Sequence, residues 1–270
     1  MPTLADVTAV AERLWPAAGT ESWDAPGLLA GVPTAPITRI HLALDATVAT
    51  AREAVDLGAE LLLVHHPLLL RGVTSVAEDR YKGAVIGTLL RGGCALLAAH
   101  TNADVVPTGT SAVLADRIGL RGSTPLVAGE SAGYGLGRVG ELDAPETLRR
   151  FAQRVGDAIP ATVGGVRVAG DPERLVRTVA LCAGAGDSLL THPAVLAADV
   201  YLTSDLRHHP ASEAIENAGV AGGPALVDIA HWAAESLWLD TAAAELRREL
   251  PGVETTVSAL STDPWTFRVD

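Results

Sequence analysis

The chain has 270 residues, of which 48% are hydrophobic, so it can bury a substantial core and is not a disordered protein. Its formal net charge is −12, which disfavours duplex nucleic acid and anionic membranes as general partners. Two cysteines in apolar runs and the lack of a targeting or membrane-spanning stretch predict a cytoplasmic protein without a disulfide framework.

The first part of the chain predicts alternating helices and strands. Thr3 and Asp6 resemble a capping box that opens a helix to about Leu14. Strands are expected over 37–44, 60–65 and 95–100, and helices over 48–57, 83–91 and 109–118. This rhythm is typical of βαβ units, in which ligands bind beyond the carboxyl ends of parallel strands. The residues at or just past those ends are Asp45, His65, His66, His100 and Asp104.

The second part predicts another α/β region after a Gly-rich linker at 121–140. Its expected strands are 138–142, 162–169, 178–182, 200–203, 225–228 and 253–260, and its expected helices are 145–155, 188–197, 210–218 and 231–250. We therefore predict an α/β fold class with two lobes that share a cleft, with the boundaries 1–125 and 126–270.

Three segments carry metal-ligand chemistry. His65 and His66 are adjacent at a strand end, so their side chains are expected to diverge and could each take a different ion; the alternative is one buried and one exposed structural histidine. Asp104 could ligate a metal while His100 orients ligands, although Asn and Asp are also common turn residues.

His231 and Glu235 form the third segment. Their spacing of four residues places both side chains on one helical face, either as half of a metal site or as a surface ion pair.

A second double-histidine motif, His208 and His209, follows Asp205. These residues could bind metal, move protons or contact substrate, and we favour an acid–base or substrate role over ligation. The glycine turn 183–188 could cradle an anion or be a simple tight turn. No nucleophile elbow is present, so a metal-activated water is the better candidate for hydrolysis.

Seven motifs in the same order resemble the GTP cyclohydrolase 1 type 2 homolog family of dinuclear-metal-centre hexameric proteins. They span nearly the whole chain, at residues 23–31, 43–47, 65–68, 100–104, 183–186, 204–209 and 231–235. The resemblance implies two α/β lobes with mixed sheets facing a central metal-binding cleft, assembled as a homohexamer. Longer members carry an extra domain between the lobes, which this chain is too short to contain.

The resemblance also implies the ligands of two divalent ions. His65 and His231 would complete one site, His66 and Asp104 the other, and Glu235 would bridge the ions. Zinc, manganese, iron, cobalt and nickel all suit such ligands. The expected function is a metal-dependent hydrolase acting on a nucleotide or phosphoester-like small molecule, with His208, His209 and Asp205 as candidate catalytic residues. The alternatives are a non-catalytic metal-binding assembly protein and, least favoured, a nucleic-acid-binding regulator.

Overall fold

The computed structural model describes residues 1–269, which form two compact units. Unit 1 combines residues 1–106 with 239–262, and unit 2 combines 107–238 with the C-terminal segment from Asp263. The sequence pattern placed a single boundary near residue 125. The structure differs because the chain returns to unit 1 at Leu239, and a later strand, β13 (Glu254–Val257), completes the first sheet.

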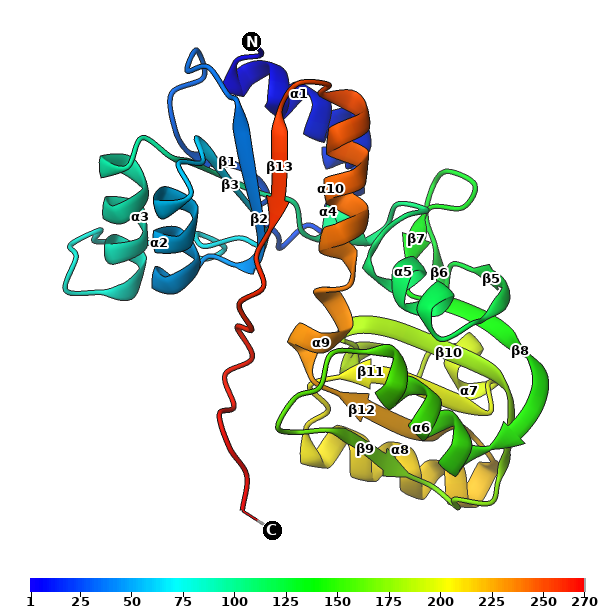
Figure 1. Cartoon of the computed structure of the whole chain (residues 1–270). Helices are drawn as coiled ribbons and strands as arrows, with labels where there is room; N and C mark the ends of the chain where they lie inside the picture. Colours follow the sequence, from blue (N-terminus) through cyan, green and yellow to red (C-terminus); the bar gives the residue numbers. More distant parts are fainter. Residues whose placement is uncertain (270) are drawn as a thin grey trace. The chain divides into compact units, whose positions relative to one another are not determined.

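Unit 1 contains a five-stranded sheet that is parallel except at one edge. The strand order is β1 (Gly27–Ala30), β4 (Ala95–Ala98), β3 (Leu61–His66), β2 (Arg39–Asp45) and β13 (Glu254–Val257), with β1 antiparallel to β4. On one side of this sheet lie α2 (Val48–Asp56) and α3 (Tyr81–Arg91), and on the other α1 (Leu4–Leu14) and α10 (Trp238–Glu249) (Figure 1). Two short helices, η1 (Ala17–Gly19) and α4 (Thr101–Asp104), complete the unit.

Local signals define these elements well. Thr3 caps α1 in the predicted capping box, with its backbone N–H donating to the Asp6 carboxylate at 2.8 Å. Thr47 caps α2 in the same manner. The strand β3 begins with four fully buried apolar residues at 61–64, as expected for a parallel strand that is covered on both faces.

Unit 2 contains a six-stranded mixed sheet and a two-stranded sheet. The order of the larger sheet is β5 (Arg121–Thr124), β8 (Arg138–Thr147), β10 (Leu175–Ala185), β11 (Val200–Ser204), β12 (Ala225–Ile229) and β9 (Val166–Ala169), with β10, β11 and β12 parallel. The helical elements of unit 2 are α5 (Thr110–Arg117), α6 (Leu148–Ala158), η2 (Asp187–Leu189), α7 (Pro193–Leu196), α8 (His208–Ala221) and α9 (His231–Glu235).

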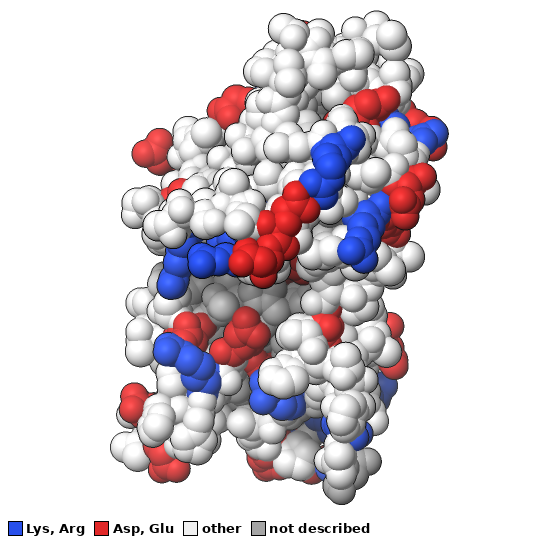
Figure 2. Space-filling model, turned by 90° about the vertical axis from the view of Figure 1, so that its left-hand side faces the viewer, with Lys and Arg blue, Asp and Glu red and all other residues white. Residues whose placement is uncertain are grey.

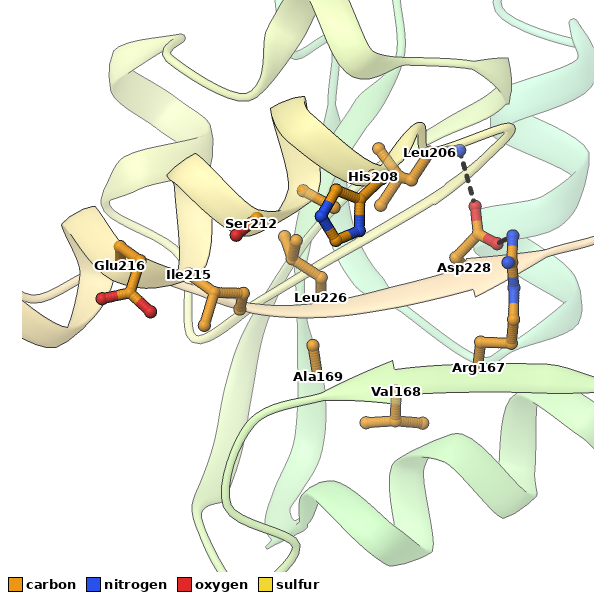
Figure 3. A pocket seen from close by; sticks show the side chains of 11 residues that line it. Arg167, Val168, Ala169, Leu206, His208, Ser212, Ile215, Glu216, Leu226 and Asp228 are labelled. Carbon is orange, nitrogen blue, oxygen red and sulfur yellow. Dashed lines mark hydrogen bonds and ion pairs between the residues drawn. The ribbon is translucent and has the colours of Figure 1, made fainter.

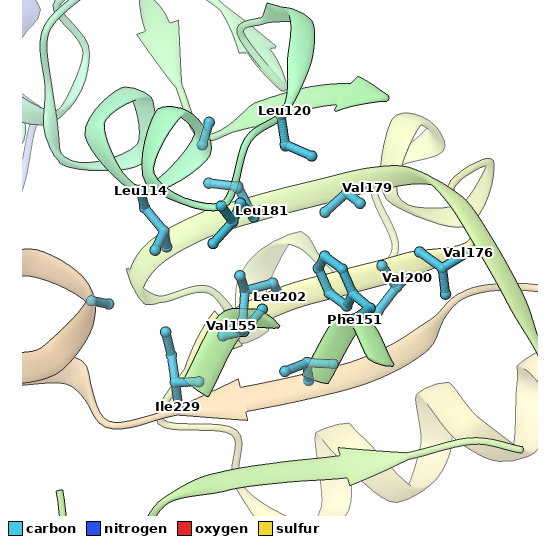
Figure 4. Packing of buried hydrophobic residues seen from close by; sticks show 14 of the residues in the cluster. Leu114, Leu120, Phe151, Val155, Val176, Val179, Leu181, Val200, Leu202 and Ile229 are labelled. Carbon is cyan, nitrogen blue, oxygen red and sulfur yellow. The ribbon is translucent and has the colours of Figure 1, made fainter. Parts of the chain in front are cut away.

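The parallel strands of unit 2 are buried on both faces, with alternating side chains in two hydrophobic clusters. Along β11, Val200 and Leu202 pack in the cluster that includes Leu114 of α5 and Phe151 of α6 (Figure 4). The intervening Tyr201 packs in the opposite cluster, against residues of α7 and α8. The core therefore fixes the carboxyl ends of these strands, where His231 and its neighbours follow.

Several predicted boundaries were wrong. The expected linker at 121–140 holds β5, β6 (Val127–Ala128), β7 (Gly135–Leu136) and the start of β8. Glycine there serves close packing, because a Cβ at Gly135 would lie under 3.0 Å from the Val127 carbonyl oxygen. The expected helix 231–250 is broken between α9 and α10, and only η2 and α7 lie in the expected helix 188–197.

The surface and the cysteines are consistent with the composition. Lys and Arg side chains lie beside Asp and Glu on the face in Figure 2, and no single basic patch covers the described residues there. Among residues 1–269, no helix has both the length and the apolar character needed to span a bilayer. Cys94 and Cys182 are both buried, and they form no disulfide.

Candidate metal centre

Three histidines converge at the carboxyl ends of the parallel strands in unit 1. His65 and His66 end β3, and His100 follows β4. One ring nitrogen of each lies within 4.8 Å of the others, which is a spacing that a single metal ion can bridge. The strand pattern therefore located this group correctly, at the sheet edge where ligands bind in open α/β folds.

The expected divergence of His65 and His66 is not observed. Their ring centroids are 5.1 Å apart, and each lies 5.1 or 5.4 Å from the ring of His100. Both residues lie within β3, and the ring of His66 is held at the strand end by its 2.7 Å contact with the Asp45 carboxylate. The two imidazoles thus belong to one cluster.

Each imidazole in this cluster is oriented through Nδ1. An oxygen acceptor lies 2.7 or 2.8 Å from that nitrogen in every case: the Ala99 carbonyl for His65, the Asp45 carboxylate for His66 and the Asp24 carboxylate for His100. A carbonyl oxygen can only accept, so Nδ1 of His65 is the donor and its tautomer is fixed. Such an acceptor behind the ring is the usual support of a metal-binding histidine, with Nε2 as the ligand atom.

Asp24, which lies 76 positions before His100 in the sequence, contacts both His100 and Thr101. Its carboxylate accepts from the Thr101 backbone N–H at 3.0 Å, from the Thr101 hydroxyl at 2.5 Å and from His100. Burial alone would raise the pKa of Asp24, but the hydrogen bonds from Thr101 and His100 outweigh it and lower the pKa below its ordinary value. An ionised Asp24 therefore anchors His100 at neutral pH.

Asp104 adds a carboxylate to the same cluster. It ends α4, it is buried, and its Oδ1 lies 3.5 Å from Nε2 of His65. The turn chemistry considered for this segment falls on Asn102, whose side chain accepts from the His100 N–H and donates to the Trp15 carbonyl. The Asp104 carboxylate thus lies beside His65, and its role as a metal ligand stays a prediction.

In unit 2, α9 presents His231 and Glu235 on one face, as their spacing predicted. Nε2 of His231 lies 2.9 Å from Oε2 of Glu235, and Nδ1 lies 2.8 Å from Oδ2 of Asp205. Glu235 is only 3% exposed, so the pair is not the surface ion pair that was the alternative. This histidine also has an oxygen acceptor behind its Nδ1, as do the three of unit 1.

The charges around His231 are strongly coupled. Burial alone would lower the pKa of His231, but Glu235 and Asp205 outweigh this effect and raise the pKa to about 11. The hydrogen bond from His231 in turn lowers the pKa of Asp205, against the opposite effect of burial. Without a metal, His231 is therefore protonated at neutral pH, and a cation that binds its Nε2 must displace that proton.

The glycine turn at 183–186 gives Glu235 its space. Gly184 has φ +80°, and a Cβ there would lie well under 3.0 Å from Oε1 of Glu235 and 3.5 Å from Cε1 of His231. A Cβ at Gly186 would collide with the hydroxyls of Tyr201 and Thr203. The helical turn that follows has only three residues, so close packing, rather than an anion cradle, accounts for this motif.

The predicted catalytic residues fall in two different places. Asp205 contacts His231 and has φ 57°, the one positive φ of a non-glycine residue among 1–269, so its backbone is held in a strained conformation. His208 and His209 lie in the first turn of α8 with ring centroids 5.1 Å apart. His208 lines a cavity of about 450 Å³ with Ser212 and Glu216, one and two turns further along the helix (Figure 3).

Sequence reasoning missed the supporting groups. Asp24 lies 76 positions before His100, and Ala99 acts through its backbone, so neither has a local signal. His100 was expected to orient ligands, whereas it lies within the cluster itself. The donors of the two units are imidazoles and carboxylates, a set that suits borderline divalent ions such as zinc, manganese or iron.

Comparison with known proteins finds a matching family model and similar relatives. The family model Duf34/NIF3 (NGG1p interacting factor 3) matches residues 2–264. A Streptomyces coelicolor protein named GTP cyclohydrolase 1 type 2 homolog is 46% identical over 276 residues, which cover 100% of this chain and 95% of the relative.

A Mycobacterium leprae protein of the same name is 34% identical over 370 residues, covering 97% of this chain and 94% of the relative. That alignment is longer than this chain, so the relative contains stretches with no counterpart here. A solved Staphylococcus aureus hypothetical protein has a TM-score of 0.89 and 26% identity, covering 98% of this chain and 99% of that one. The predicted mixed α/β fold is thereby confirmed.

Proposed function

The chain belongs to the Duf34/NIF3 family, and from this premise we propose that it binds two divalent ions and uses them to hydrolyse a small molecule. The observation that supports this proposal most is the common orientation of four histidines, His65, His66, His100 and His231. Each has an oxygen acceptor within 2.8 Å of Nδ1, which selects Nε2 as the ligand atom.

We propose the ligand set His65, His66, Asp104, His231 and Glu235, with Glu235 bridging the two ions as the sequence resemblance implies. We add His100 to this set, because one of its ring nitrogens lies within 4.8 Å of ring nitrogens of His65 and His66. Asp24, Asp45 and Asp205 would then be positioning residues that hold imidazoles rather than contact substrate. When bound, the ions would supply Lewis acidity that activates a water for attack.

The substrate proposed is a nucleotide or a related phosphoester, in a homohexamer of this chain. The names of the relatives support a nucleotide, since they are called GTP cyclohydrolase 1 type 2 homologs. His208 and His209 remain the proposed acid–base or substrate-contacting groups. His208 faces a cavity beside polar residues of α8, where its imidazole could contact a bound molecule.

A non-catalytic role in metal storage, delivery or sensing is the second candidate. The observation that favours this non-catalytic role is the position of His208 and His209, whose rings lie against each other. Within the described part of unit 2, neither belongs to the group around His231 and Glu235. A protein of this kind would need the metal ligands and not the second histidine pair.

Turnover assays separate these two functions. Metal-loaded and chelator-treated protein would be offered GTP, GMP and p-nitrophenyl phosphate, together with a His208→Ala/His209→Ala double variant. Hydrolysis that requires metal and falls at least tenfold in the double variant supports the enzyme, because acid–base groups typically contribute that much or more. Full metal content with no turnover of any substrate favours the non-catalytic role.

A further inference from the structure

A cavity of about 570 Å³ adjoins His231 within unit 2. Four segments line it: the end of β12 with the residues that follow it, the turn 163–165 with Arg167 of β9, the pair Asp205 and Leu206 after β11, and the C-terminal segment from Asp263 to Arg268. This volume lies in the range of small-molecule pockets. One wall includes His231 and Asp205, so a bound molecule would lie beside a proposed metal ligand.

Two aromatic side chains on this cavity are largely exposed. Trp265 is 69% exposed and Phe267 is 78% exposed, although both line the cavity. They lie two residues apart in a segment that forms no helix or strand. Aromatic rings in this position offer flat apolar surfaces on which a planar ring can stack.

The same cavity brings charged groups of both signs together. Arg167 and Arg268 line it, and so do the carboxylates of Asp205 and Asp228. Asp228 accepts from Arg167 and from the Leu206 N–H (Figure 3), and Asp205 accepts from His231. A guanidinium has five donors, so Arg167 can hold Asp228 and still donate to an anionic ligand.

Two further features of the lining bear on how a ligand would fit the cavity: the position of a carboxylate and the space at the turn. Asp263 is a third carboxylate in the lining, so an anionic group of the ligand would lie on the side of the two arginines. At the turn, Gly165 has φ +58°, and a Cβ added to Gly164 would meet no atom within 4 Å. The turn therefore leaves space that a larger side chain could fill without moving the backbone.

From these features we propose that the cavity beside His231 binds a small molecule with a planar aromatic ring and an anionic group. The ring stacks on Trp265 or Phe267, and the anionic group receives hydrogen bonds from Arg167 and Arg268. The inference deepens the proposed function, on which it rests, by naming the pocket that holds the substrate of the metal centre.

Calorimetric binding of GMP and phenyl phosphate, to both chelator-treated and metal-loaded protein, tests this pocket. Guanosine lacks the anionic group and ribose 5-phosphate lacks the aromatic ring, so both should bind at least about tenfold more weakly than GMP. The variants Trp265→Ala and Arg268→Gln should each weaken GMP binding by about tenfold. Gly164→Trp, which fills the cavity, should abolish it.

Two exposed residues of unit 2 provide matched controls. Arg149→Gln removes a guanidinium that is 61% exposed, and Leu175→Ala removes an apolar side chain that is 63% exposed. Neither lines the cavity, so both should leave GMP binding unchanged. Metal content should stay at the wild-type value in all five variants, because none of them changes a proposed ligand.

The outcomes separate this inference from the metal proposal. GMP that binds a metal-free protein and is lost in the cavity variants supports the pocket even if the hydrolase proposal fails. The pocket is refuted if neither GMP nor phenyl phosphate binds, or if both bind equally well to folded Trp265→Ala, Arg268→Gln and Gly164→Trp proteins. GMP binding that requires metal and is unchanged in all three cavity variants would place the ligand elsewhere.

Discussion

Replacing Gly184 with alanine should disable the metal centre while leaving the protein folded. A Cβ at this position would lie well under 3.0 Å from Oε1 of Glu235 and 3.3 Å from its Cδ, both closer than ordinary van der Waals contact. Glu235 is buried, so its carboxylate must shift and lose the 2.9 Å contact with Nε2 of His231.

The expected magnitude has two parts. The positive φ of +80° costs an alanine about 1–2 kcal/mol of folding free energy. Displacement of Glu235 should lower metal affinity by about 10–100-fold, the range found when groups that orient metal ligands are removed. The first effect would be measured by urea unfolding of the metal-free protein, and the second by competition with a zinc chelator.

Gly222 offers a closely matched control. It has φ +79°, yet a Cβ there would meet no atom within 4 Å. Gly222→Ala should therefore lose folding stability through its positive φ without displacing Glu235, and it should show no loss of zinc affinity. If the two variants bound zinc equally well, the account of the glycine turn as clearance for Glu235 would be refuted.

Three further results are expected. Asp205→Asn should weaken zinc binding by about 10–100-fold in a chelator competition assay, because His231 loses the carboxylate that orients it; an unchanged affinity would contradict that role. Asp24→Asn should act similarly through His100, with a neighbouring exposed change, Glu21→Gln, as its control. The raised pKa of His231 should stabilise the metal-free protein fully below about pH 6.5, and this contribution should disappear as the pH rises through about 11. Unfolding curves over this pH range should show a weaker dependence in Glu235→Gln, and an unchanged dependence would show that Glu235 does not control His231.

The candidate site was largely predictable where its signals are local. The helical spacing of His231 and Glu235 and the placement of His65, His66 and Asp104 at strand ends follow from periodicities of about 3.6 and two residues. These periodicities also identified the central strands of both sheets. The positions of these five residues in the structure agree with the sequence pattern, and their joint metal binding stays a proposal.

Long-range pairing could not be predicted from one sequence. The return of β13 to pair with β2 joins residues more than 200 positions apart, and the contact of Asp24 with His100 depends on the packing of two separate loops. The structural role of each glycine could not be predicted from the sequence for a related reason. The same residue type forms turns, allows strands to approach at Gly135 and clears space for a buried carboxylate at Gly184, and only the surroundings distinguish these uses.

The metal content per chain tests the central claim most directly. Elemental analysis would be performed on protein purified without chelators, for the wild type, for Glu235→Ala and for His208→Ala as a control outside the ligand set. The account predicts two divalent ions per wild-type chain, a marked loss in Glu235→Ala and no loss in His208→Ala. A wild-type protein that contains no metal and binds neither added zinc nor added manganese would contradict it, and the histidine cluster would then have to be structural.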